Sequence, residues 1–594
     1  MAIEERTTPG DVRWGEYAAD EYSDALVASM KLGGIDNLFF VSGSEIAFWQ
    51  EAVAKASSRG TPTPRLITVM HESVALNAAM GSSMVSGHPA ATAVHVDVGT
   101  FNYGGAIHTA WRGSYPVLMT AGSAPRAFPG SMAGARTTAV QWIQEPRDQG
   151  EILRQYTKVD HRLEYQDNPG MIVSRLLQLA MSEPKGPIYM SIPREVAMLP
   201  LHGRTRFPTR DQMGIVRQAW PDPSDARTVA RWLIESENPC IYPGRSGRNP
   251  ESVEALVRLA ELLAIPVNDQ RVDRLNFPTT HPLHGVGPSP KDADVALVIE
   301  TSMPWRPGAG SPAADARIVW IDPDPGESRY KTVEYCADMW LPVTAAAAAR
   351  AIHAAAEGML TKSDMSRIED RRRRLAERKQ AQEAAAEAAG IRAGHRRPIH
   401  PRWVAYQLGK IMDENAILVD DTLTASAVSD VYHRRSKAGT FFKSGGSSGG
   451  WGPGAAFGAK IAAPDRDVVL ASGDGYFMFG TPLPALWCAN HYKAPYVSVI
   501  FVNKSYSTGT TTLRATYPEG VAVSTGNYEG GLFDPPPNFA KLAEAANGYG
   551  ETVSDPDEVA PALRRALEYT RRGTPALIAV DLPTLIDDKD MGGG

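Results

Sequence analysis

The sequence predicts an α/β protein with three doubly wound parallel-sheet domains. Short apolar runs alternate with longer helical patterns through most of the chain, as in parallel strands joined by helices. The 594 residues exceed what a single core accommodates, at roughly 150 residues per domain. Apolar residues make up 43% of the chain and charged residues 22%, which is ordinary globular usage and excludes wholesale disorder.

The first domain is predicted over residues 1–200. Helical patterns at Tyr17–Lys31 and Ser44–Ala56 flank an apolar strand at Asn37–Val41, and a further strand follows at Arg65–Val69. This order of elements indicates an open parallel sheet.

The second domain is predicted over residues 201–358. It contains two strongly apolar strands, Val295–Ile299 and Ile318–Ile321, between helical patterns. Residues 359–398 form a charged helix and linker, because Lys362–Ala389 is rich in Arg, Glu, Gln and Ala and contains no Gly or Pro.

The last domain, residues 399–594, places polar residues directly after two apolar strands. The strand Val468–Ala471 leads into Gly473-Asp474-Gly475, and the strand Tyr496–Val502 ends at Asn503. Ligands of parallel sheets bind beyond the carboxyl ends of the strands. We therefore expect Asp474 and Asn503 to lie together at one edge of this sheet.

Asp474 and Asn503 suit a metal ion bound to a diphosphate. Magnesium prefers oxygen ligands and commonly takes one or two from a protein, with phosphate and water completing the set. The flanking Gly473 and Gly475 allow the backbone to approach a phosphate closely. Gly-Asp-Gly alone is a common turn, but its place between a strand and a helix favours the metal site.

This arrangement resembles the cofactor motif of the thiamine-diphosphate-dependent enzymes, the superfamily of acetolactate synthase, benzoylformate decarboxylase and 2-hydroxyacyl-CoA lyase. The resemblance implies a pyrimidine-binding first domain, a central domain and a diphosphate-binding last domain. It also implies that Mg²⁺ is held by the side chains of Asp474 and Asn503 and by the backbone carbonyl of Ser505. Two departures are Val502, where relatives usually have a second asparagine, and a longer spacing that places a small insertion around Thr481–Pro484.

In this superfamily a glutamate of the first domain protonates the aminopyrimidine of the cofactor, and Glu72 matches that position at the start of a small-residue helix. A glutamate that favours the helix dipole is the alternative. By the same resemblance the cofactor-binding residues are Glu72, Asn102, Thr424, Gly449, Gly450, Gly473, Asp474, Gly475, Asn503, Ser505 and Tyr506.

Three residues are candidates for contact with substrate. His95 matches a pocket histidine of benzoylformate decarboxylase-like enzymes and could carry a proton, although a merely hydrogen-bonded histidine is the alternative. Ser44 matches a serine that meets a substrate carboxylate, with a helix N-cap as its alternative. Trp451 could support the cofactor or the substrate, with a core tryptophan as its alternative. The second pocket histidine of those enzymes has no counterpart at Ser302–Pro307.

The resemblance implies a lyase that cleaves a C–C bond of a 2-oxo acid, as a decarboxylase does, or of a 2-hydroxyacyl-CoA compound, with carboligation in reverse. An acetolactate-synthase-type carboligase and a catalytically silent cofactor-binding homologue are the alternatives. The segment Glu300–Gly310 does not match a flavin-binding pattern, so we expect no FAD. An ADP portion of coenzyme A remains open for the central domain, with ordinary surface cations as the alternative. The candidate phosphate partners are Arg306, Arg396, Arg397, His433, Arg434 and Arg435.

Charge and cysteine usage set the expected partners. The net charge of −6 is spread over mixed acidic and basic residues, which favours a small-molecule substrate over nucleic acid or a membrane. Three isolated cysteines and an N-terminus unlike a signal peptide indicate a cytoplasmic protein. Because the superfamily assembles its site across two chains, we expect a homodimer or a homotetramer.

Overall fold

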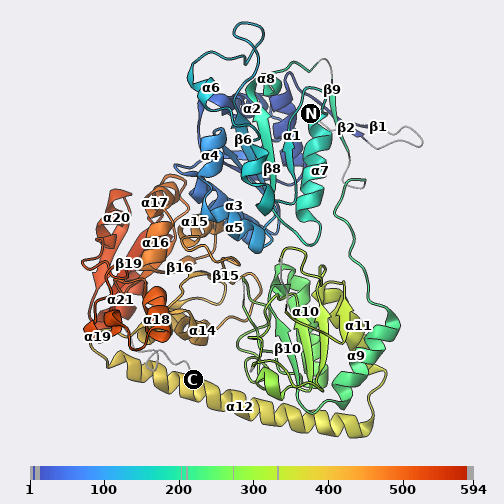
Figure 1. Cartoon of the computed structure of the whole chain (residues 1–594), viewed down its shortest axis with the longest axis vertical. Helices are drawn as coiled ribbons and strands as arrows, with labels where there is room; N and C mark the ends of the chain where they lie inside the picture. The colour runs from blue at the N-terminus through green and yellow to red at the C-terminus, as the bar shows by residue number, and fades with distance from the viewer. Residues whose placement is uncertain are drawn as a thin grey trace.

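The computed structural model describes residues 4–6, 14–201, 204–208, 212–271, 273–308, 310–330 and 334–584. Three α/β bodies follow one another along the chain, and Figure 1 shows the long helix α12 running along one side of the molecule past the second and third bodies. The main sheet of each body is parallel throughout, which confirms the predicted fold class.

The N-terminal sheet has six strands in the order β4-β3-β5-β6-β8-β7. Every residue of β5 and β6 is buried, as expected of central strands covered by helices on both faces. The strands are β3 (Asn37–Phe40), β4 (Arg65–Thr68), β5 (Ala90–Val94), β6 (Val117–Ser123), β7 (Asp160–Arg162) and β8 (Ile188–Pro193). The helices are α1 (Tyr22–Leu32), α2 (Phe48–Ser58), α3 (Glu72–Ser86), α4 (Asp97–Phe101), α5 (Gly105–Arg112), α6 (Val140–Ile143), α7 (Pro169–Met181) and α8 (Arg194–Ala197).

The beginning of the chain differs from the helix predicted at Tyr17–Lys31. Trp14–Ala18 forms the strand β2, which lies between β1 and β9 in a small antiparallel sheet. Glu21 and Asp24 form a capping box that starts α1, so capping chemistry sets this boundary. The outer strands of the small sheet are β1 (Glu4–Arg6) and β9 (Arg204–Pro208).

The central sheet has four strands in the order β10-β11-β12-β13. The strands are β10 (Pro239–Pro243), β11 (Val295–Ile299), β12 (Arg317–Ile321) and β13 (Met339–Leu341), and the helices are α9 (Pro223–Glu235), α10 (Pro250–Leu263) and α11 (Ala345–Glu357). Helix α12 (Lys362–Gly394) then ends at Gly394 rather than at Ala389. Its Arg371 is buried and donates to the backbone carbonyls of Ser236 and Leu263, at 2.8 and 2.6 Å, which anchors the helix to the central domain. None of the helices within the described ranges is both long and apolar enough to cross a membrane.

The C-terminal sheet has six strands in the order β15-β14-β16-β17-β19-β18. They are β14 (Ile417–Asp421), β15 (Phe441–Lys443), β16 (Val468–Gly473), β17 (Val497–Val502), β18 (Tyr549–Val553) and β19 (Ala576–Asp581). The helices are α13 (Pro401–Ile411), α14 (Ser426–Tyr432), α15 (Gly452–Ala462), α16 (Asp474–Phe479), α17 (Pro482–His491), α18 (Ser507–Thr516), α19 (Val521–Thr525), α20 (Phe539–Ala545) and α21 (Pro556–Arg571). The hydroxyl of Thr422 donates to Asp420 at 2.6 Å, and this turn leaves Thr422–Ala425 as a loop before α14.

The N- and C-terminal domains share one core through the helices α3 and α15. A Cβ atom at Gly458 would lie 1.9 Å from the carbonyl oxygen of Ala78, and one at Gly81 would lie 2.1 Å from that of Ala455. Only glycine allows the two helices to approach so closely. The shared core includes residues of both domains, among them Phe39 and Phe457. This contact fixes the N-terminal end of α3 beside the C-terminal domain.

Candidate active site

The carboxyl ends of β14, β16 and β17 surround a pocket of about 120 Å³ in the C-terminal domain. Asp474 begins α16 directly after β16, Asn503 follows β17, and Thr424 lies in the loop after β14. The predicted residues that line this pocket are Thr424, Gly473, Asp474, Gly475, Asn503, Ser505 and Tyr506. The structure therefore brings together the whole predicted metal and diphosphate set of this domain.

The Asp474 carboxylate is buried without a compensating cation. Its side chain accepts from the amide of Lys504 at 2.6 Å and from the amide of Gly475 at 2.8 Å. Burial raises the pKa of Asp474 to about 6, and these amide hydrogen bonds oppose the rise only in part. Within the described residues, no lysine, arginine or histidine forms an ion pair with it. A divalent cation would supply the missing positive charge.

Asn503 and Ser505 form a turn beside Asp474. Lys504, between them, has a left-handed backbone with φ of 61°, and its amide is the one that bonds Asp474. The amide oxygen of Asn503 accepts from the Ser505 amide at 3.2 Å. At Gly473 an added Cβ atom would meet nothing within 4 Å, so the backbone is open to a ligand there. The oxygen donors and the open backbone fit a magnesium ion bridged to a diphosphate.

Gly449, Gly450 and Trp451 lie outside the lining of this pocket and pack beside α16. A Cβ atom at Gly449 would lie 2.5 Å from the ring of Tyr476, and one at Gly450 would lie 2.4 Å from the amide nitrogen of Gly480. Trp451 is only 2% exposed and belongs to the core shared by the two domains. Its position matches the interpretation of a core tryptophan, so we assign it no contact with substrate.

Glu72 and Asn102 meet in the N-terminal domain. Glu72 is the first residue of α3 and is 8% exposed, and its carboxylate accepts from the side-chain amide of Asn102 at 3.2 Å. The next residue, Ser73, lies with its hydroxyl 3.2 Å from that of Thr481, just before α17. The end of α3 that carries Glu72 therefore touches the C-terminal domain of the same chain. Glu72 itself is not among the residues that line the 120 Å³ pocket.

His95 and Ser44 meet through a fully buried carboxylate, that of Glu45. The ring Nε2 of His95 is in close contact with this carboxylate, and the Ser44 hydroxyl donates to the same oxygen at 2.6 Å. The other carboxylate oxygen accepts from Gln141 at 2.9 Å. Burial acts to raise the pKa of Glu45, but the hydrogen bonds from Ser44, Gln141 and His95 outweigh it and hold this pKa below its usual range. The cluster therefore holds an ionised glutamate against an imidazole.

Ser44 is not a helix N-cap, although it begins the helical pattern predicted at Ser44–Ala56. Ser44–Ile46 forms a single 3₁₀ turn, α2 begins at Phe48, and the Ser44 hydroxyl bonds Glu45 rather than a helix amide. Sequence reasoning missed Glu45 and Gln141 altogether. The position of Ser44-Glu45 directly after a strand could have indicated a role for Glu45. No sequence pattern connects the distant Gln141 with it.

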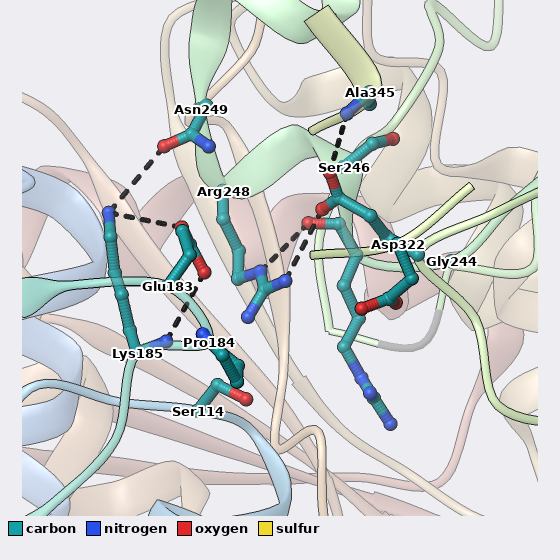
Figure 2. Close-up of polar contacts among 12 residues, drawn as sticks. Ser114, Glu183, Pro184, Lys185, Gly244, Ser246, Arg248, Asn249, Asp322 and Ala345 are labelled. Carbon is teal, nitrogen blue, oxygen red and sulfur yellow. Dashed lines mark hydrogen bonds and ion pairs between the residues drawn. The ribbon is translucent and has the colours of Figure 1, made fainter. Parts of the chain in front are cut away.

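The carboxyl ends of β10, β11 and β12 carry a buried network of charged residues. Arg248 pairs with Glu300 at 3.3 Å, and the second oxygen of Glu300 accepts from the amide of Ala345 at 2.8 Å. Figure 2 shows Arg248 between Glu183 and Lys185 of the N-terminal domain on one side and Asp322 on the other. Burial raises the pKa of Glu300 to about 7.

This network also fastens the central domain to the N-terminal domain. Arg329 donates to the hydroxyl of Ser114 at 2.6 Å and to the carbonyls of Trp111 and Pro184 at 3.0 and 3.1 Å. The side chain of Lys185 reaches Asn249 at the start of α10 at 3.5 Å. These contacts cross the boundary between the two domains.

The predicted phosphate partners of an ADP portion do not all lie in the central domain. At the strand ends of this domain, Glu183, Glu300 and Asp322 surround Arg248. Arg306 lies in the loop after β11. Arg434 pairs with Glu383 of α12 at 3.1 Å, and Arg435 is buried and donates to the carbonyl of Asp413 in the C-terminal domain at 2.6 Å.

Three models of thiamine pyrophosphate enzyme domains match the chain in order. The N-terminal TPP binding domain matches residues 20–152, the central domain matches residues 226–341, and the C-terminal TPP binding domain matches residues 424–580. The three matches coincide with the three α/β bodies of the structure.

Curated relatives and solved structures agree with these matches. Benzoylformate decarboxylase of Pseudomonas aeruginosa is 28% identical over 460 residues, which cover 74% of this chain and 79% of that protein. An acetolactate synthase large subunit of Mycobacterium tuberculosis is 26% identical over 565 residues, which cover 93% of this chain and 94% of that protein. The structure of a thiamine diphosphate-dependent 4-hydroxybenzoylformate decarboxylase of Rhodococcus jostii is 22% identical with a TM-score of 0.72, covers 96% of this chain and 100% of that one, and is alike in fold.

Proposed function

The chain belongs to the thiamine pyrophosphate enzyme family, and from this we propose that it is a lyase that releases carbon dioxide from a 2-oxo acid. The observation that carries the choice of a 2-oxo acid is the cluster of Ser44, Glu45 and His95, which offers a hydroxyl donor beside an imidazole. The similarity to benzoylformate decarboxylase supports it, because benzoylformate is itself a 2-oxo acid. A 2-hydroxyacyl compound, free or as its coenzyme A ester, is the second substrate class within this proposal.

Thiamine diphosphate, when bound, supplies the carbon nucleophile and the electron sink for breaking the C–C bond. Asp474 and Asn503 would hold the magnesium ion with their side-chain oxygens, and Ser505 would contribute its backbone carbonyl. Thr424, in the loop after β14, would donate to the diphosphate, and the open backbone at Gly473 would admit it. The C-terminal domain alone would thus bind the diphosphate end of the cofactor.

Glu72 would exchange a proton with the aminopyrimidine nitrogen of the cofactor. Asn102 orients the carboxyl group by donating to it at 3.2 Å. Because Glu72 is only 8% exposed, bulk water has little access to the exchanged proton.

His95 moves a proton to or from the reacting oxygen of the substrate. When substrate binds, the Ser44 hydroxyl rotates away from Glu45 and donates to the substrate carboxylate instead. Glu45 holds the imidazole of His95 in one orientation through the close contact at Nε2. The same oxygen of Glu45 accepts from Ser44, so one carboxylate positions both groups that meet the substrate.

We propose that the enzyme is a homodimer or a homotetramer whose sites are completed by two chains. In support, the part of the pocket lining that the structure describes contains residues of the C-terminal domain and none of the N-terminal domain, which carries Glu72. Mixing inactive Glu72→Ala and Asp474→Ala proteins under conditions of subunit exchange should then restore roughly a quarter of wild-type activity, because half of the dimers are mixed and each has one intact site. No recovery after demonstrated exchange would show that both residues act within one chain.

A substrate panel tests the reaction. Purified protein with thiamine diphosphate and Mg²⁺ should release carbon dioxide from benzoylformate or from aliphatic 2-oxo acids, and chelation of the metal should stop the release. Formation of acetolactate from pyruvate, with no release of free aldehyde, would instead identify an acetolactate-synthase-type carboligase. The similarity to acetolactate synthase supports this alternative. Cofactor binding without turnover of any 2-oxo acid or 2-hydroxyacyl compound would identify a catalytically silent homologue.

A further inference from the structure

A groove of about 700 Å³ lies between α12, the central domain and the C-terminal domain, outside the site described above. Its walls are formed by Arg271, Thr279, His284 and Gly285 of the central domain, by α12, and by α13 and α14 of the C-terminal domain. Figure 1 shows α12 passing along both domains, so three parts of the chain meet at the groove. The proposed reaction uses none of these residues.

Two residues of the groove lining carry buried nitrogen atoms without a hydrogen-bond partner among the described residues. They are Nε of Arg271 and Nε2 of His284. An unpaired buried polar atom costs about 1–3 kcal/mol, so two of them at one cavity indicate a site for a polar ligand. Arg271 also has a left-handed backbone with φ of 42°. Strained backbone of this kind is concentrated at binding sites.

Arg271 and Lys379 place positive charge beside His284. Lys379 donates to the carbonyls of Thr279 and His284 at 2.9 and 3.1 Å, which fixes its ammonium group at the groove. Burial, followed by the charges of Arg271 and Lys379, lowers the pKa of His284 to about 3. The imidazole is therefore neutral at neutral pH and can donate or accept one hydrogen bond at Nε2.

Most charges of the groove are paired, including that of Arg271, whose guanidinium lies 3.7 Å from the carboxylate of Asp430. Arg434 pairs with Glu383 at 3.1 Å, and Lys410 pairs with Glu387 at 3.0 Å. The charge of Lys379 has no carboxylate of its own, because its neighbour Glu383, at 3.9 Å, is the partner of Arg434. The lining therefore has an excess of positive charge next to the two unpaired nitrogen atoms.

We infer that this groove is a second ligand site, which binds a small molecule carrying one carboxylate or phosphate group. The acid group accepts a hydrogen bond from Nε of Arg271 and lies near the ammonium group of Lys379, while His284 contributes its Nε2. The rings of Tyr406 and Tyr432, with centroids 5.6 Å apart and planes at 87° to each other, form an aromatic corner against which the body of the ligand packs.

The short helix α14 connects this groove to the cofactor pocket. Ala427, Asp430 and Val431 of α14 line the groove, and the loop Thr422–Ala425 just before the helix lines the cofactor pocket. Arg271 donates to the backbone carbonyl of Asp430 at 2.9 Å, so a ligand that engages Arg271 also acts on α14. Occupation of the groove should therefore change the affinity for thiamine diphosphate. Only this consequence rests on the proposed function, whereas binding at the groove does not.

Binding is tested by calorimetric titration of the full chain, first with inorganic phosphate and separately with acetate, at constant ionic strength and with the cofactor pocket saturated by thiamine diphosphate and Mg²⁺. Wild-type protein should bind at least one of the two probes saturably, and Arg271→Gln should weaken that binding at least tenfold. The matched control is Arg373→Gln, which removes the same charge from an exposed position of α12 that does not line the groove. It should change affinity less than twofold.

Because Arg271 also supports α14, a second variant separates folding from binding. Val431→Trp fills the groove from a half-exposed position without removing a charge, and it should abolish probe binding while the melting temperature stays near that of wild type. The probe should shift the concentration of thiamine diphosphate that half-saturates wild-type protein, but not that of Val431→Trp. Absence of saturable binding of both probes, or equal binding by Val431→Trp and wild type, would overturn the inference even if the enzyme decarboxylates 2-oxo acids. A protein that binds the probe but no cofactor would refute the proposed function alone.

Discussion

The N- and C-terminal sheets have the same strand order, which is β4-β3-β5-β6-β8-β7 in one and β15-β14-β16-β17-β19-β18 in the other. The two domains nevertheless shift the pKa of a buried carboxylate in opposite directions. In the C-terminal domain Asp474 is buried with amide donors only, and its pKa is raised. In the N-terminal domain Glu45 is buried among Ser44, Gln141 and His95, and its pKa is lowered. One fold thus holds one buried carboxylate by amide donors alone and another by the side chains around it.

The central domain surrounds a buried carboxylate in a third way, again at the carboxyl ends of its strands. Its buried carboxylate Glu300 is paired with Arg248, and the surrounding network holds the central domain against the N-terminal domain. The local surroundings of each carboxylate, rather than the sheet itself, decide whether a strand end binds a ligand or joins two domains.

Removal of the Asp474 carboxylate should have the largest effect on activity. Asp474→Ala deletes a metal ligand, so we expect activity to fall at least about 1,000-fold and cofactor affinity to fall with it. Activity assays and a fluorescence titration with thiamine diphosphate and Mg²⁺ measure both quantities. Asp465→Asn, at an exposed position in the same domain, is the control and should behave as wild type. Unchanged metal dependence in Asp474→Ala would remove this residue from the site.

Glu72→Gln should separate binding from turnover. The variant keeps a hydrogen-bond partner for Asn102 but cannot exchange a proton, so activity should fall about 100- to 1,000-fold. Cofactor affinity should stay within a few fold of wild type, because the diphosphate is held by the other domain. Glu51→Gln, exposed on α2, is the matched control. A parallel loss of cofactor binding would mean that Glu72 acts in binding rather than in proton exchange.

Glu45→Gln tests whether the Glu45 carboxylate positions the imidazole of His95. We expect kcat to fall roughly tenfold, as for loss of the partner that orients a functional histidine, with a smaller change in KM. The decisive readout is a double-mutant cycle, because Glu45→Gln should have little further effect in a His95→Ala background. Independent, multiplying effects of the two substitutions would show that Glu45 acts on the fold alone.

Glu300→Gln should have the smallest effect on activity and a measurable effect on stability. The pKa of Glu300 is raised from 4.5 to about 7 in the folded protein, so the fold favours the protonated form. Its stabilising contribution is therefore complete below about pH 4.5 and is lost as the pH rises through 7, by up to about 3 kcal/mol.

Scanning calorimetry of wild type and Glu300→Gln at pH 5 and pH 8 measures this contribution. Glutamine stays neutral at both pH values. The melting temperature of the variant, relative to that of wild type, should therefore be higher at pH 8 than at pH 5. The same shift in both proteins would assign the pH dependence to other groups.

Local sequence patterns predicted most of the C-terminal site. The side chains that follow β16 and β17 line one pocket because parallel strands present their carboxyl ends at one edge. The predicted start of the first helix, Tyr17, was wrong for a local reason, because a capping box begins α1 at Tyr22. The Glu45 cluster could not be predicted, because its Gln141 lies far away in sequence and only the packing of α6 brings it to the carboxylate.

The amino-acid sequence by itself determined the three parallel-sheet domains, the residues of the diphosphate pocket and the glutamate at the start of α3. These features depend on apolar periodicity and on residues next to strand ends, which are local properties of the chain. Only the tertiary structure decided the charge balance of each buried carboxylate and the presence of the groove along α12. Both depend on which distant side chains are packed together, and burial makes the electrostatic consequence of each such neighbour large.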